Sequence, residues 1–147
     1  MAKGALAPYL GEGKGAASAP IVWGGDLFFI GDRFEHRAAQ PIDITGRARC
    51  LLHGPYIILP PGIWSAALSL QFSREAAEHD FLVEAVTDRQ LASTTIRPHH
   101  DGHFDGELTF VIDDSSDNPV SIRLSTQRAA FDGLVMLSGA RLSQHPA

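Results

Sequence analysis

Hydrophobic and polar residues alternate one by one along much of the chain beyond residue 26. The longest such run is GIWSAALSLQFS, residues 62 to 73, in which Trp64, Leu68 and Phe72 fall on one side and mostly small or polar residues on the other. Since successive side chains of a strand point to opposite faces, the run predicts a strand with one buried and one solvated face. Trp64 is therefore expected in the core.

Two further segments repeat this alternation. They are HFDGELTFVI, residues 103 to 112, and PVSIRLST, residues 119 to 126. Less regular apolar runs predict further strands at 26–31, 47–52, 55–59, 81–87, 91–96 and 134–142. Helical propensity is confined to SREAAEH, residues 73 to 79, which is long enough for a turn or two.

Short turn signals separate these runs. They are Pro60-Pro61-Gly62, Asp101-Gly102, the stretch 113–118 and Asp132-Gly133. About nine short strands at this spacing predict an antiparallel two-sheet β-sandwich, with Leu68, Phe110 and Ile122 sealed between the sheets. At the LPPG corner, residues 59 to 62, proline fixes φ at the second turn position and Gly62 is expected to take a positive φ.

The first twenty residues differ from the rest, because glycine, alanine, proline and serine dominate them. A segment that buries so little predicts a flexible arm, 1–22, in front of a sandwich domain, 23–147. Tyr9, Leu10 and Leu6 are candidate anchors, either on the chain's own domain or on a neighbouring subunit. The GEGKGA stretch within the arm lacks the preceding strand and the hydroxyl after Lys14 that a phosphate loop needs.

Size, charge and cysteine content narrow the function classes. The chain has 147 residues, enough for one domain, and a net charge of −5 with its twelve lysines and arginines scattered. A nucleic-acid partner is therefore not expected, and no apolar run is long enough to span a membrane. The single cysteine, Cys50, excludes an internal disulfide and, with no apolar leader, favours a cytoplasmic location. Cys50 alternates with Ala48 and Leu52 and is expected to be a packed small residue.

The stretch GPYIILPPGIWSAALSLQF, followed by DGHFDGELTFVI, PVSIRLST and FDGLVMLSGARL, resembles β-sandwich carbohydrate-binding modules and related jelly-roll domains of bacterial polysaccharide-handling proteins. The resemblance covers residues 46 to 142 and lies in the order of strands and turns. It implies an all-β fold of jelly-roll type and a tendency to bind sugars. No binding residue is carried over from it, because no local motif of the family is matched.

A sugar site needs an exposed aromatic ring that meets the sugar's C–H groups, together with planar or charged groups that bond its hydroxyls. Trp23 and Tyr56 are the candidate platforms, since neither lies within the best alternating runs. Arg123 offers a forked donor and Glu107 an acceptor, both at outward strand positions. Two alternatives stay open: Trp23 pins the arm to the sandwich, and the outward polar faces are simply solvated.

Histidines and acidic residues in two turns raise the question of a metal. RPHHDGHFDGE places His99, His100 and His103 around an Asp-Gly turn, and two imidazoles with a carboxylate would suit zinc. The spacing matches no established zinc pattern, so solvated histidines are the favoured interpretation and no metal is assigned. For DDSSDN, residues 113 to 118, an EF-hand calcium loop is excluded, because Leu124 stands where its last position needs glutamate. Two interpretations stay open: a structural calcium bound by other loop oxygens, and a polar loop whose side chains bond its own backbone.

The sequence contains neither a G-x-S-x-G elbow nor a distinctive carboxylate pair, so no catalytic activity is predicted. The leading hypothesis is a non-catalytic β-sandwich that binds carbohydrate through an aromatic platform with Arg123 and Glu107. The second is a self-associating interaction domain whose arm, 1–22, crosses to another copy and forms a homo-oligomer. The third is a metal-dependent enzyme at the hairpin of residues 99–103.

Overall fold

The computed structural model describes residues 20–31, 40–113 and 117–146, and the backbone of residues 33–37. The elements in chain order are β1 (Ile21–Gly24), η1 (Gly25–Leu27), β2 (Phe29–Ile30), β3 (Arg33–Arg37), β4 (Ile42–Asp43), β5 (Cys50–Ile57), β6 (Gly62–Phe72), η2 (Arg74–Ala76), β7 (Phe81–Val86), β8 (Gln90–Ile96), β9 (Gly102–Ile112), β10 (Val120–Thr126) and β11 (Leu134–Gln144). Within these residues, no helix is long and apolar enough to cross a membrane.

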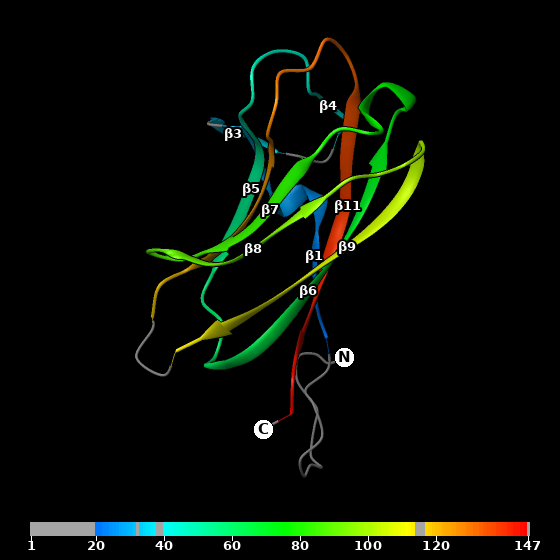
Figure 1. The fold of residues 1–147 in the computed structure, drawn as a ribbon. Coiled ribbons are helices and arrows are strands. Elements are labelled where there is room, and N and C mark those ends of the chain that lie inside the picture. The colour runs from blue at the N-terminus through cyan, green and yellow to red at the C-terminus, as the bar shows by residue number, and fades with distance from the viewer. Residues whose placement is uncertain (1–19, 32, 38–39, 114–116, 147) are drawn as a thin grey trace.

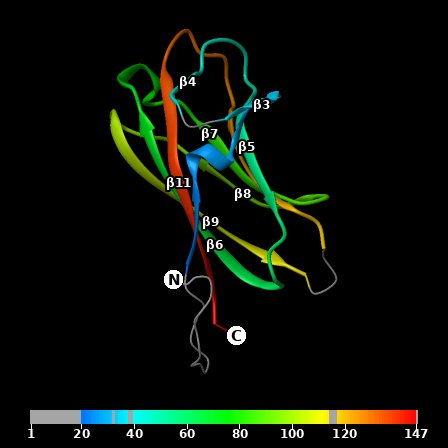
Figure 2. The same ribbon diagram turned by 180° about the vertical axis from the view of Figure 1, so that it is seen from behind.

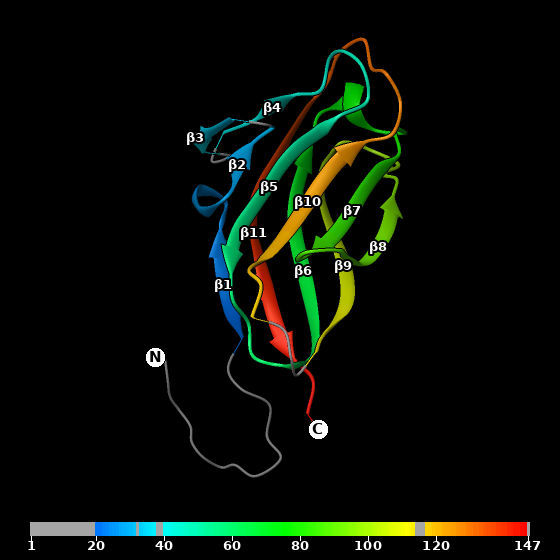
Figure 3. The same cartoon turned by 90° about the vertical axis from the view of Figure 1, so that its left-hand side faces the viewer.

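The strands form two antiparallel sheets packed face to face (Figure 1). Sheet A has the order β1-β11-β6-β9, and the short β4 also pairs with β11. Sheet B has the order β3-β2-β5-β10-β7-β8. Figure 3 shows sheet B in front of sheet A, and Figure 2 shows β1 alongside β11 from behind. The two-sheet antiparallel sandwich predicted from the alternating runs is confirmed.

The core lies between the two sheets and is built from the inward positions of the alternating strands. Leu68 on β6, Phe110 on β9 and Ile122 on β10 are all buried, as predicted. Trp64 is also buried, and its indole N–H donates to the carbonyl of Pro60 at 2.9 Å. This bond satisfies the one polar atom of the ring, so Trp64 can be buried without an unpaired donor.

One long strand, β5, replaces the two strands predicted at 47–52 and 55–59. It continues through Gly54 and Pro55, and Pro55 faces Ser121 of β10. Gly54 has a φ of +136° and lies so close to Leu27 that a Cβ would be 3.3 Å from its carbonyl oxygen. Only glycine fits there without strain, which is why a residue typical of turns sits inside a strand.

The N-terminal part of the domain also differs from the prediction. Where one strand was expected at 26–31, the structure has the end of η1 and the short β2, and β1 precedes them. Ile21 and Val22, assigned to the arm from composition, pair with β11 in sheet A. The candidate anchors Tyr9, Leu10 and Leu6 and the GEGKGA stretch lie outside the described residues.

Candidate functional site

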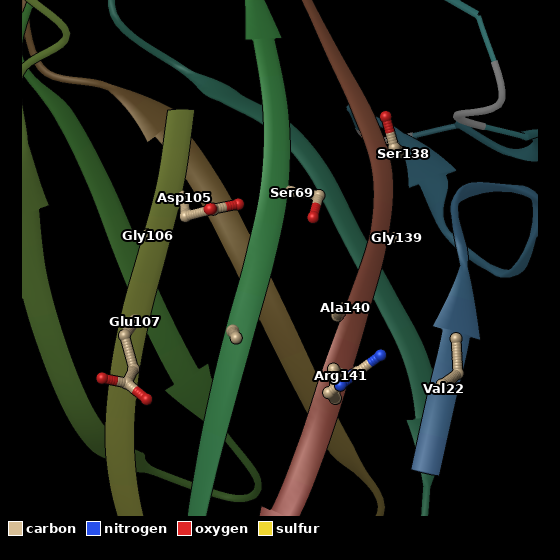
Figure 4. Close-up of a pocket in the computed structure, with 10 residues that line it drawn as sticks. Val22, Ser69, Asp105, Gly106, Glu107, Ser138, Gly139, Ala140 and Arg141 are labelled. Carbon is tan, nitrogen blue, oxygen red and sulfur yellow. The ribbon is translucent and has the colours of Figure 1, made fainter. Parts of the chain in front are cut away.

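A shallow groove of about 590 Å³ crosses the outer face of sheet A. Figure 4 shows side chains from four strands around it. This central groove is lined by Val22 of β1, Ala67 and Ser69 of β6, Asp105, Gly106 and Glu107 of β9, and Ser138, Gly139, Ala140 and Arg141 of β11. Charges of both signs line it, with Asp105 and Glu107 on β9 and Arg141 on β11.

Strand register decides which side chains meet in the central groove. Ala67 of β6 pairs with Glu107 on one side and with Arg141 on the other. Glu107 and Arg141 therefore lie two strands apart, about 10 Å between backbones. The row above runs from Asp105 through Ser69 to Gly139. The groove thus has an acidic wall on β9, a basic wall on β11 and a floor of small residues.

A β-bulge in β11 shapes the floor of the central groove. The register jumps from Leu137 to Gly139, so Ser138 faces no residue of β6. The bulge lets Leu137 and Ala140 both point into the core while Ser138 and Gly139 line the groove. Gly139 also allows β1 to approach, because a Cβ there would lie 3.0 Å from the carbonyl oxygen of Trp23.

The charged groups of the central groove differ in how far they are already bonded. His103 Nε2 lies 2.7 Å from Asp105 Oδ1, and His103 Nδ1 lies 3.3 Å from the side-chain amide nitrogen of Gln71, so Asp105 already has a partner. Glu107 and Arg141, both exposed, have no ion pair or side-chain hydrogen bond to any residue that the structure describes. These two groups are therefore free to bond a ligand.

Backbone comparisons find solved structures of several kinds of protein. One is an arabinose-bound α-L-arabinofuranosidase of the GH51 type, at 15% identity and a TM-score of 0.48. The match covers 67% of this chain but only 18% of that protein. A family 16 carbohydrate-binding module matches 67% of this chain and 71% of its own at 11% identity and a TM-score of 0.44.

A Stig cyclase from Fischerella sp. TAU, bound to (3Z)-3-(1-methyl-2-pyrrolidinylidene)-3H-indole, matches 97% of this chain and 82% of its own at 15% identity and a TM-score of 0.47. No protein-family model matches the chain, and neither does any curated protein. At TM-scores below 0.5, these backbone matches assign no role to any residue of this chain.

The structure does not bring the four predicted sugar-binding residues together. Trp23 is only 2% exposed, with its ring 6.5 Å from that of Phe28, so its prediction as an exposed platform is wrong. Trp23 follows the alternation of β1 and pairs with the inward-facing Ala140, which turns its ring into the core. Glu107 alone of the four lines the central groove.

Tyr56 and Arg123 belong to the opposite sheet. The Tyr56 hydroxyl lies 2.6 Å from His53 Nδ1, and its ring packs against those of His53 and Phe29. Arg123 is half-buried between His53 and Glu84, its partners on the neighbouring strands. The sequence alone did not indicate that Glu107 and Arg141 line the same groove, because this depends on the pairing of β6 with both β9 and β11.

The three histidines of the predicted hairpin have three different partners. His99 Nδ1 is 3.6 Å from Glu78, His100 Nδ1 bonds the carbonyl of Asp101, and His103 bonds Asp105. No group of three or more histidine, cysteine, aspartate or glutamate side chains able to hold a metal ion is found among the described residues.

The loop considered for calcium is described only at its ends, since residues 114–116 lie outside the described part. At its first position, Asp113 lies 3.5 Å from the guanidinium of Arg89. This contact supplies the carboxylate with a cationic partner from the protein itself. A calcium ion bound through Asp113 would have to share that carboxylate with Arg89.

Cys50 lies on sheet B and is partly buried. Burial is the main cause that raises the pKa of its thiol above the ordinary value, while a hydrogen bond with Ser125 opposes the shift. The thiol therefore stays protonated at neutral pH, and the thiolate that a nucleophile requires is scarce. This agrees with the prediction of a packed residue.

Proposed function

We propose that the protein binds carbohydrate in the central groove, without cleaving it. The observation that carries the proposal is the pair Glu107 and Arg141, facing across the small side chain of Ala67. A carboxylate accepts hydrogen bonds from two neighbouring hydroxyls, and a guanidinium donates a fork of them. A pyranose offers hydroxyls along both of its edges, so it can use both walls at once.

The floor of the groove suits the flat side of a sugar. Ala67, Ser69 and Gly139 leave the space between the walls open, and Val22, 65% exposed, adds an apolar contact at the end of the row. Among the residues that the structure describes, none that lines the central groove is aromatic. Hydrogen bonds to charged groups, each worth about 1.5–3 kcal/mol, therefore supply most of the affinity.

The placement of the carboxylates favours binding over hydrolysis. Asp105 and Glu107 are neighbours on the same face of β9, about 7 Å apart along the strand. Hydrolysis of a glycosidic bond needs two carboxyl groups that flank the bond from opposite sides. In this groove the side opposite the carboxylates is occupied by Arg141.

Affinity electrophoresis tests the proposal. Native gels that contain hydroxyethyl cellulose, xylan, β-glucan, galactomannan or amylopectin should retard the protein on at least one polysaccharide. Glu107→Gln and Arg141→Gln should each weaken this retardation about tenfold, as the loss of a charge-assisted bond predicts. Glu84→Gln and Arg123→Gln make the same chemical changes on sheet B and should keep it. Retardation on none of the gels, or equal loss in all four variants, would contradict the proposal.

A further inference from the structure

Phe131 is the most exposed of the large hydrophobic side chains that the structure describes. It is 99% exposed, whereas the next, Val22, is 65% exposed. It lies in the loop of residues 127–133, between β10 and β11. The domain's own core does not use this ring, so both of its apolar faces are available to a ligand.

The loop that carries Phe131 is held in place on both sides of the ring. Gly46 and Ala130 exchange two backbone hydrogen bonds of 2.9 Å, and Ile44 N–H donates to the carbonyl of Gly133 at 3.0 Å. Gly133 has a φ of +128° and is in close contact with Ile44, which leaves no room for a side chain. The backbone around Phe131 is thus fixed before any partner binds, which reduces the entropy cost of binding.

A second depression links the central groove to this end of the molecule. It has a volume of about 380 Å³ and shares Ser138 with the central groove. This upper groove is lined by Pro41, Gln71, Phe72, Ser73, Leu134, Val135, Met136 and Ser138. Together the two grooves follow β11 from Arg141 to Leu134, about 24 Å at the rise of an antiparallel strand. Phe131 is three residues before Leu134, which places it at most about 11 Å further on.

We infer that the ligand is a linear carbohydrate chain that lies along β11, and that its far end stacks on Phe131. This inference rests on the proposed function. It adds that the ligand is long enough to span both grooves and that Phe131 contacts its far end. The apolar face of an aromatic ring packs against the C–H face of a sugar. The upper groove, with Leu134 45% exposed beside Gln71 and Ser73, suits the mixed apolar and hydroxyl surface of the sugars in between.

Calorimetry with oligosaccharides of increasing length tests the inference. Cello-, xylo- and malto-oligosaccharides, from disaccharide to hexasaccharide, are titrated into the full chain. For the series that binds, Phe131→Ala should weaken the hexasaccharide about tenfold and leave the disaccharide unchanged, since loss of one stacked ring is of that order. Phe131→Leu should behave like Phe131→Ala, and Phe131→Tyr should restore wild-type affinity. Because the side chain is fully exposed, these variants are expected to fold as the wild type does.

A matched control removes another exposed apolar side chain. Ile58 is 58% exposed between β5 and β6, outside both grooves, and Ile58→Ala should bind every oligosaccharide like the wild type. Wild-type binding of the hexasaccharide by Phe131→Ala, or an equal loss at every length, would overturn the role of Phe131 and leave the proposed function standing. If the wild type bound no oligosaccharide of any length or series and no polysaccharide gel, the proposed function would fail first.

Discussion

Glu107 and Arg141 face each other across Ala67, each one strand away from it, and neither has a side-chain partner among the described residues. At about 10 Å between their strands, solvent separates the two charges and their mutual attraction is small. The protein therefore holds an acceptor and a donor at a fixed spacing, without the two neutralising each other. A ligand that bonds both gains two charge-assisted contacts without breaking an existing ion pair.

Filling the floor of the central groove should abolish binding without unfolding the protein. Ala67 points outward between the two walls, so Ala67→Trp places a large ring where the ligand would lie. We expect loss of retardation in the polysaccharide gel and a melting temperature within a few degrees of the wild type. Ser93→Trp, at an exposed position on the edge strand of sheet B, is the control and should bind normally.

Gly139 should tolerate no side chain. A Cβ at this position would lie 3.0 Å from the carbonyl oxygen of Trp23, on the backbone of β1. Gly139→Ala is therefore expected to lower the free energy of unfolding by about 1–3 kcal/mol, as overpacking does. Urea denaturation measures this, with the exposed neighbour Ser138→Ala as control, expected within about 0.5 kcal/mol of the wild type. Equal stability of Gly139→Ala and the wild type would show that β1 moves away at no cost.

The Cys50 thiol should react slowly while the protein is folded. Its pKa lies above the ordinary value of 9.0, chiefly through burial, and the thiolate is the reactive form. At pH 8 we expect Ellman's reagent to modify the folded protein at least about tenfold more slowly than the protein unfolded in guanidinium. Because the folded pKa is the higher one, the protonated thiol favours folding below pH 9, and this contribution is lost as the pH rises toward the folded pKa. Equal rates in the two states would contradict the burial of the thiol.

Asp43 should titrate at a lower pH than a free aspartate. The hydroxyl and the backbone N–H of Thr45 donate to its carboxylate at 2.6 and 2.9 Å, and these bonds lower the pKa of Asp43 below 3.8. The ionised form therefore favours folding above that pH, and the contribution is lost as the pH falls through the folded pKa. An NMR titration should find the pKa closer to 3.8 in Thr45→Val and unchanged in Thr45→Ser. The same pKa in both variants would exclude the hydroxyl as the main cause.

The long alternating strands could be predicted from the sequence because their signal is local. In β6, β9 and β10 every second residue is apolar, and Leu68, Phe110 and Ile122 are buried as this period requires. The passage of β5 through Gly54 and Pro55 could not be predicted, since residues that usually mark turns are there required by close approach to Leu27.

The candidate site was harder to predict than the strands, because it depends on which strands are neighbours. Glu107 could be identified as an outward residue, but Arg141 becomes its counterpart only through the pairing of β6 with both β9 and β11. Trp23 was misassigned because four residues of β1 are too few to show an alternation. No sequence pattern distinguishes Phe131 from a core phenylalanine. Its exposure depends on the loop of residues 127–133, which backbone hydrogen bonds to Gly46 and Ile44 hold in place.

The bulge at Ser138 has a consequence for how β11 tolerates change. Val135 and Leu137 point inward before it, and Ala140 and Leu142 point inward after it, so the two halves of the strand are in opposite phase. Because Ser138 is the residue without a partner on β6, deleting it would join the two halves in one continuous alternation, with the same four side chains still facing the core. Loss of this residue is therefore expected to keep the core and to change the outer surface, because Ser138 lines both grooves on sheet A.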